Sequence, residues 1–154
     1  MSKVIIIGAG AAGIMAAVSS ALNGHTVSIY EKNDRIGRKL YITGKGRCNI
    51  TNAADMKTIM ENVVNNSKFL YSAFKQFDNQ DVVEMLENAG CPTKVERGNR
   101  VFPVSDKSSD VIKAFQKILS ELSVEVNLKA EVNSLIIEDS ICKGIKLADK
   151  SIYA

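Results

Sequence analysis

Three glycines near the start of the chain have the spacing of a phosphate-binding loop. Gly8, Gly10 and Gly13 follow a four-residue apolar run and precede a stretch with helical character. In such a loop the first glycine permits a tight turn, the second lets the backbone approach a pyrophosphate, and the third lets helix and strand pack closely. The unpaired amides that begin the helix attract negative charge, and here they belong to Ala11 and Ala12. The spacing therefore predicts a dinucleotide phosphate site.

A carboxylate follows at the distance expected for a ribose contact. Glu31 lies 18 residues beyond Gly13, at the end of a second expected strand that begins at Thr26. A carboxylate there can accept hydrogen bonds from a ribose diol, and it would repel a 2′-phosphate. Small residues also occur at tight strand-to-helix turns that bind nothing. The strand before the glycines, the helix that should end near Gly24 and the acid together favour the dinucleotide interpretation.

The segment after Glu31 is basic and rich in glycine. Between Arg35 and Arg47 the chain has five cationic side chains and no acidic one. Its glycines supply backbone freedom and accessible amides. A domain that binds only a nicotinamide dinucleotide normally continues with another strand and helix. This loop instead predicts a segment that wraps the pyrophosphate and brings amides up to a flat ring.

Several blocks of the sequence together resemble one bacterial family. They are the glycine motif, Glu31-Lys32, Gly37-Arg38-Lys39, the block from Thr43 to Asn52, and the Arg100-Val101-Phe102-Pro103 stretch. This combination resembles the BaiN-like NAD(P)/FAD-dependent oxidoreductases, some of which are called aminoacetone oxidase-like. The resemblance covers the whole chain and is most specific at Arg47-Cys48-Asn49. It implies a flavoprotein that binds FAD, with NAD(P)H as the reductant.

The resemblance also implies which residues contact the cofactor. Glu31 would hold the adenosine ribose, Arg38 and Lys39 would lie along the cofactor, and residues 43–49 would lie near the flavin ring. The backbone around Val132 would approach the adenine. The complete set of expected cofactor-binding residues is Gly8, Gly10, Ala11, Ala12, Gly13, Glu31, Lys32, Gly37, Arg38, Lys39, Thr43, Gly44, Gly46, Arg47, Cys48, Asn49 and Val132. The resemblance assigns no catalytic residue.

The expected fold is α/β, a Rossmann-like FAD-binding domain of the two-dinucleotide-binding-domain flavoprotein type, with a helical insertion and a β-meander. Residues 1–52 contain the β-α-β unit and the basic loop. Residues 53–122 form the insertion, because apolar residues recur there at helical spacing. Residues 123–154 change to strand periodicity. Members of the family continue into a further strand and a substrate domain, so we expect 1–154 to be a partial, C-terminally truncated domain.

The cysteine and histidine content indicates which metal and redox chemistry to expect. Cys48, Cys91 and Cys142 have no short spacing and the chain has one histidine, His25. This pattern disfavours a metal site and favours a reduced cytoplasmic setting. Cys48 is interpreted as a packed residue rather than a redox thiol, since no second cysteine is close in sequence. The apolar N-terminal segment could also be a secretory signal, but three glycines at dinucleotide spacing argue against it.

Three classes of function are compatible with these patterns. The first is a flavoenzyme, with a small-molecule substrate and neither nucleic acid nor membrane as a partner. The second is a catalytically inert dinucleotide-binding fragment or an NAD-binding module. The third is a nucleic-acid binder, which a net charge of +3 and a single aromatic residue, Tyr41, in the basic loop disfavour. The residues specify neither the substrate, nor the choice between NADH and NADPH, nor the oligomeric state.

Overall fold

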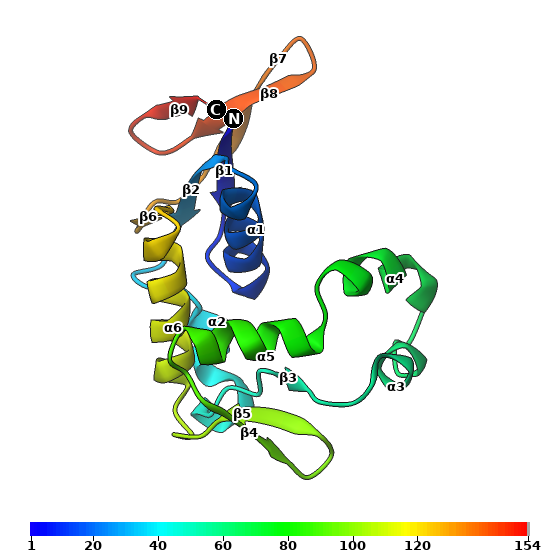
Figure 1. Ribbon diagram of the computed structural model, residues 1–154. Coiled ribbons are helices and arrows are strands. Elements are labelled where there is room, and N and C mark those ends of the chain that lie inside the picture. Colours follow the sequence, from blue (N-terminus) through cyan, green and yellow to red (C-terminus); the bar gives the residue numbers. More distant parts are fainter. Residues whose placement is uncertain (154) are drawn as a thin grey trace. The chain divides into compact units, whose positions relative to one another are not determined.

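The computed structural model describes residues 1–153 and separates into two compact units (Figure 1). Unit 1 combines residues 1–40 with the segment from residue 115 onward, and unit 2 consists of residues 41–114. The two boundaries fall within helices α2 (Arg38–Ile42) and α6 (Ser108–Glu121). The dinucleotide motif and the block around Arg47 therefore belong to different units.

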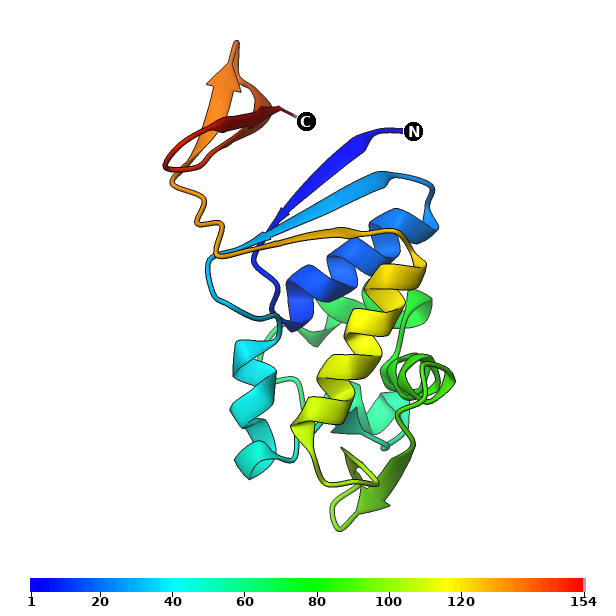
Figure 2. The ribbon, with the colours of Figure 1, turned by 90° about the vertical axis from the view of Figure 1, so that its left-hand side faces the viewer.

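A parallel sheet with the order β1-β2-β6 forms the centre of unit 1. Its strands are β1 (Lys3–Ile7), β2 (Thr26–Glu31) and β6 (Glu125–Leu128). Helix α1 (Ala11–Leu22) connects the first two strands, and Figure 2 shows it along one face of the sheet. The central strand is buried from Val27 to Glu31, as expected for a parallel strand that is covered on both faces. This β-α-β unit confirms the sequence prediction.

An antiparallel meander completes unit 1. It consists of β7 (Ser134–Glu138), β8 (Ile141–Lys146) and β9 (Ser151–Tyr153). Asp139 and Ser140 both have positive φ and join β7 to β8, which matches the turn geometry of a two-residue hairpin. On the sheet side, Tyr30 packs with Ile145 and Leu147. The meander thus shares a core with the parallel sheet.

The first meander strand begins later than its sequence predicts. The strand periodicity of residues 130–138 predicts one strand from Ala130, but β7 begins at Ser134. The N–H of Lys129 donates to the Asn33 carbonyl and the N–H of Ala130 donates to the Glu31 carbonyl. These hydrogen bonds hold the connecting segment against the end of β2, so its first residues cannot join the meander.

Unit 2 contains the expected helices and a small sheet. The helices are α3 (Met56–Glu61), α4 (Ser67–Gln76), α5 (Asn79–Asn88) and the first half of α6. The sequence predicts Asp78 or Asn79 as the cap of this helix, and Asp78 caps α5 through the amides of Gln80 and Asp81. Strands β3 (Thr51–Asn52), β5 (Arg100–Pro103) and β4 (Thr93–Glu96) form an antiparallel sheet in that order. This sheet was not predicted, because strands of two to four residues are too short to show a period.

The backbone of the β1–α1 turn leaves no room for a side chain at Gly13. An ideal Cβ there would lie 1.9 Å from the Gly8 carbonyl oxygen. We expect Gly13→Ala to lower the free energy of unfolding by about 1–3 kcal/mol, because backbone must move to relieve the clash. Urea denaturation measures this change. At Gly10 a Cβ meets no heavy atom within 4 Å and φ is −77°. Gly10→Ala is therefore the control, and equal stability of the two variants would contradict the prediction.

Candidate functional site

The glycine loop of unit 1 is shaped by the end of β1. Gly8 has a φ of +95°, which a glycine adopts readily, and its N–H donates to the Tyr30 carbonyl at 2.8 Å. The chain then turns into α1, whose N-cap is Gly10. The Gly10 carbonyl accepts from the N–H of Ile14 at 2.9 Å, so the helix is formed from its first turn.

The start of α1 can receive an anion. The N–H groups of Ala11, Ala12 and Gly13 have no carbonyl four residues earlier inside the helix to bond with. No side chain caps them, and the first turn contains no acidic residue. The positive end of the helix dipole is therefore not compensated by the helix itself. Space in front of Gly10 is open, since a Cβ there would touch nothing within 4 Å.

Glu31 ties the glycine loop to the end of β2. Its Oε2 accepts the Ala9 N–H at 2.7 Å, and its Oε1 accepts the backbone N–H of Asn33 at 2.8 Å and also the side-chain amide of Asn33. The residue is 8% exposed. Burial alone raises the pKa of this carboxyl, but the hydrogen bonds from Ala9 and Asn33 outweigh it and lower the pKa below 4.5. Glu31 is therefore ionised at neutral pH.

Gly8, Glu31 and Asn33 help to line a cavity of about 370 Å³ at the carboxyl ends of β1 and β2. It is lined by Ile7, Gly8, Tyr30, Glu31, Lys32, Asn33, Ala130, Glu131 and Val132. The structure thus brings together four of the sequence-predicted residues, namely Gly8, Glu31, Lys32 and Val132. Ligands of open α/β sheets bind at this end of the strands.

Gly37 and Arg38 lie next to this site. The Gly37 N–H donates to the Ala9 carbonyl at 2.7 Å, and Arg38 Nη1 donates to Asn33 Oδ1 at 2.6 Å. Each therefore contacts a residue that Glu31 also binds. Lys39, on the same helix α2, is exposed.

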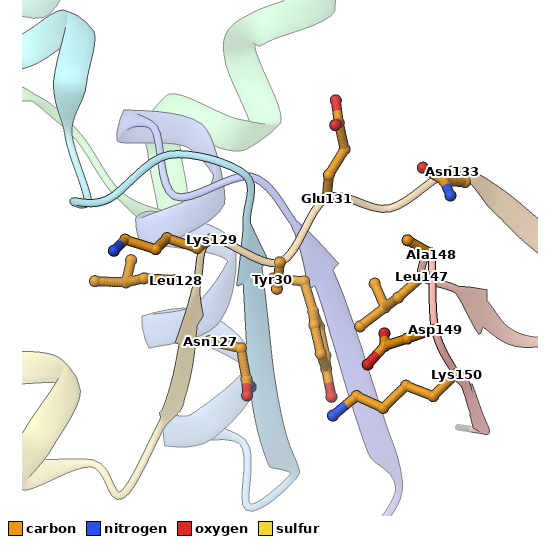
Figure 3. Close-up of a pocket in the computed structure, with 11 residues that line it drawn as sticks. Tyr30, Asn127, Leu128, Lys129, Glu131, Asn133, Leu147, Ala148, Asp149 and Lys150 are labelled. Carbon is orange, nitrogen blue, oxygen red and sulfur yellow. The ribbon is translucent and has the colours of Figure 1, made fainter.

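A second cavity of about 360 Å³ lies between β6 and the meander, and sequence reasoning did not predict it (Figure 3). Tyr30, Asn127, Asp149 and Lys150 are among its lining residues. Burial and the Glu125 carboxylate raise the pKa of the Tyr30 phenol, which stays neutral. Among residues 1–153, the Asn127 amide nitrogen is buried without a hydrogen-bond partner. No motif in the sequence indicates this cavity.

The block Thr43–Asn49 in unit 2 has an unusual backbone. Gly44, Lys45, Gly46 and Cys48 all have positive φ, between 57° and 86°. For the two non-glycine residues this conformation costs about 1–2 kcal/mol each. The Cys48 N–H donates to the Thr43 carbonyl at 3.0 Å, and the Ile50 N–H donates to the Val101 carbonyl at 2.9 Å. The first bond closes the loop and the second attaches it to β5.

Arg47 makes an ion cluster with residues from the β4–β5 region. Its Nε and Nη2 donate to Asp106 Oδ1 at 2.8 and 2.6 Å, and Nη2 also donates to Glu96. Lys94 donates to Asp106 Oδ2 at 2.7 Å. The Arg47 guanidinium also lies 4.2 Å from the centre of the Phe102 ring. The cations hold the pKa values of Glu96 and Asp106 below their usual range, through their hydrogen bonds and charge.

Cys48 lies inside unit 2 and is 1% exposed. Burial raises the pKa of its thiol, and a hydrogen bond with Thr43 opposes this only in part. Cys91 is buried as well, and burial first and then the nearby Asp110 and Glu87 carboxylates raise the pKa of its thiol. Both are protonated thiols at neutral pH, so the geometry supports the packing interpretation of Cys48.

Two features are absent from residues 1–153. Helices long and apolar enough to cross a membrane are absent from this part of the chain. Within the same residues, no group of three or more His, Cys, Asp or Glu side chains could hold a metal ion.

The Glu31 hydrogen bonds predict a pH-dependent contribution to stability. Because the pKa is lowered on folding, the contribution is present above pH 4.5 and disappears as the pH falls through the lowered value. We expect Glu31→Gln to destabilise the chain by about 1–3 kcal/mol at pH 7, since one amide hydrogen would face a backbone donor. The difference from wild type should shrink in acid. Urea midpoints at several pH values measure it, with exposed Glu61→Gln as the control; a pH-independent difference would contradict the prediction.

If Cys48 is a packed residue and not a redox centre, its substitution should change the stability of the chain and leave cofactor binding intact. We expect Cys48→Ser to lower the free energy of unfolding by about 1–3 kcal/mol, because a hydroxyl replaces a buried thiol. The same variant should retain FAD binding. Thermal denaturation and flavin fluorescence measure the two effects, with exposed Cys142→Ser as the control. Normal stability combined with lost flavin reduction would instead identify Cys48 as a redox centre.

Two curated relatives of this chain are named as enzymes. The chain is 31% identical over 137 residues to a 3-dehydro-bile acid delta(4,6)-reductase from Clostridium scindens, covering 88% of this chain and 33% of that protein. It is 27% identical over 134 residues to a ribosomal RNA dihydrouridine synthase from Haemophilus influenzae, covering 87% and 33%. The chain therefore spans about a third of the length of these relatives.

Solved structures share the fold. The model matches a 3-ketosteroid-delta4-(5alpha)-dehydrogenase from Rhodococcus jostii with a TM-score of 0.68 and 16% identity, over 98% of this chain and 43% of that one. It matches a glycine oxidase from Bacillus cereus with a TM-score of 0.63 and 14% identity, over 99% and 54%. At these identities the matches show the α/β Rossmann-like fold alone.

The family follows from a match over nearly the whole chain. Residues 2–154 match the model described as the HI0933-like protein Rossmann domain. The parallel sheet, the glycine loop and the acid at the end of β2 are the features expected of such a domain. The chain therefore belongs to the HI0933-like family of FAD-dependent oxidoreductases, as its Rossmann-like FAD-binding domain.

Proposed function

We propose that unit 1 binds the ADP half of FAD in the cavity beside Glu31. One observation carries this proposal. The ionised Glu31 and residues 130–132 line one cavity at the carboxyl ends of β1 and β2, and the uncapped start of α1 comes directly after the Gly8 turn that also lines it. This combination provides one group for each part of the ligand, and the same end of the sheet is where nucleotides bind in this fold class.

The pyrophosphate is assigned to the start of α1. The first-turn amides can donate to phosphate oxygens, and the helix dipole favours their charge. The open space in front of Gly10 allows backbone and ligand to approach closely. Gly13 acts differently, because it keeps α1 close to the β1–α1 turn and does not need to touch the ligand.

The ribose is assigned to Glu31. Each carboxylate oxygen can accept two hydrogen bonds, and Oε2 receives one, from Ala9. A second acceptor position on Oε2 therefore remains for a ribose hydroxyl. Because the carboxyl is ionised, the same site disfavours a 2′-phosphate. The Ala130–Val132 backbone forms the opposite wall, where the adenine ring would lie.

The flavin-proximal part of the proposal involves unit 2. Thr43, Gly44, Gly46, Cys48 and Asn49 are the residues proposed to lie beside the ring, on the basis of the family resemblance. Bound FAD supplies hydride and electron transfer, while the protein binds and orients the reactants. The Clostridium scindens relative is named a reductase, which supports an enzyme that reduces a small-molecule substrate. NAD(P)H as the electron donor is proposed on the basis of the family resemblance alone.

Gly10→Val tests the phosphate assignment. We expect this variant to bind FAD at least about tenfold more weakly than wild type, because an isopropyl group would occupy the pyrophosphate space and displace a hydrogen-bonded contact. Flavin fluorescence titration of the whole chain measures the affinity. Ala16→Val is the matched control, since it adds the same kind of bulk at an exposed position of α1. Urea midpoints show that both variants are folded.

Two results would contradict the assignment of the ADP half of FAD to unit 1, and a third would contradict only the flavin-proximal part of the proposal. Full FAD affinity in Gly10→Val would show that the pyrophosphate lies elsewhere. Binding of NAD with equal affinity to FAD would favour the NAD-binding module. Binding of ADP with no additional affinity for FAD would indicate that the chain provides only the adenosine half of the site.

A further inference from the structure

The side chain of Arg47 is held on two sides by unit 2. Two of its nitrogens donate to Asp106 and Glu96, and its guanidinium plane lies against the Phe102 ring. We propose that Arg47 is a positioning residue that fixes the backbone of residues 43–49 and does not itself contact the bound ligand. Only the effect on FAD affinity rests on the proposed function.

The Phe102 ring connects the guanidinium to the loop backbone. An ideal Cβ at Gly44 would lie 3.1 Å from Phe102 Cε1 and 2.9 Å from the Asn49 nitrogen. One part of the ring therefore packs against Gly44 while the guanidinium of Arg47 packs on the ring. The ring, the glycine and the arginine form a continuous stack, so displacement of the arginine would release the loop.

The loop needs such external support because its backbone conformation is unfavourable. Lys45 and Cys48, on either side of Arg47, have φ values of 58° and 61°. Non-glycine residues keep this conformation only where the surrounding structure determines it strongly. Inside the loop, the Arg47 N–H donates to Gly44 at 3.3 Å and the Cys48 N–H to Thr43 at 3.0 Å. Hydrogen exchange of the Arg47 and Cys48 amides therefore measures whether the loop keeps its shape.

A ligand would compete poorly for this arginine. Arg47 and Lys94 face two carboxylates, those of Glu96 and Asp106, so the four charges balance. Moving the guanidinium toward an anion would leave both acids with Lys94 as their shared partner. The cluster is about one-third exposed, with side-chain values from 30% to 42%, so high salt should weaken it. Acid should weaken it too, once the pH falls through the lowered pKa values of Glu96 and Asp106.

Amide hydrogen exchange in the cofactor-free whole chain tests the proposal, with Arg47→Met and Asp106→Asn as the variants. We expect the amides of Arg47 and Cys48 to exchange about tenfold faster in both, which corresponds to the loss of about one net hydrogen bond. The two changes together should add little to either alone, because they remove the same interaction. Glu61→Gln, which weakens the exposed Lys57–Glu61 pair, is the control and should change neither amide.

The residues at which amide exchange becomes faster distinguish a positioning role of Arg47 from a general contribution to the stability of unit 2. Faster exchange throughout residues 41–114 would show that the cluster only stabilises the unit and would overturn the proposal. Arg47→Lys should restore part of the protection, since an ammonium keeps the charge but cannot form the paired contacts or the flat stack. Unchanged exchange at Cys48 in every variant would likewise overturn it.

An FAD titration of the same variants separates the two proposals. We expect Asp106→Asn and Arg47→Met to weaken FAD binding by similar factors, because both release the loop. Strong loss in Arg47→Met alone, with Asp106→Asn normal in affinity and exchange, would identify Arg47 as a ligand contact and overturn the positioning role. If wild type does not bind FAD, the proposed function fails, and the exchange measurement still decides the role of Arg47.

Discussion

The hydrogen bond from the Ala9 N–H to the Glu31 carboxylate is the contact on which the unit 1 site depends. It fixes the glycine loop at the end of the second strand. The same carboxylate binds Asn33, and the Glu31 carbonyl accepts the Ala130 N–H. One residue thus determines the spacing of three segments that line the cavity. Because the carboxyl is buried and ionised, loss of any donor would leave a desolvated charge, which favours a rigid arrangement.

The parts of the fold that follow from short sequence patterns were predicted correctly. The β-α-β unit needs only a buried strand, a glycine turn and an amphipathic helix in succession. Asp78 indicates the start of α5, because a capping side chain binds amides only two and three residues further along the chain. Val132 is a different case. Its place in the cavity wall was expected from the resemblance, since nothing in its own neighbourhood of the sequence indicates a ligand.

Features that depend on distant partners could not be predicted in this way. Arg47 binds Glu96 and Asp106, which lie 49 and 59 residues further along the chain. The β3-β5-β4 sheet is built from strands too short to show alternation. Cys48 and Cys91 are both buried, which their neighbouring residues in the sequence do not indicate. In each case the sequence shows the residue type, and tertiary structure decides its role.

The two units therefore use different physical means to shape a loop. In unit 1 a glycine supplies the positive φ at the turn, so the backbone needs no external force to adopt it. In unit 2, Lys45 and Cys48 adopt positive φ without that freedom, and the loop relies on the stack of Phe102 and Arg47. The unit 2 loop therefore depends on salt and pH, because the ion cluster that holds Arg47 against Phe102 is partly exposed and contains two carboxylates.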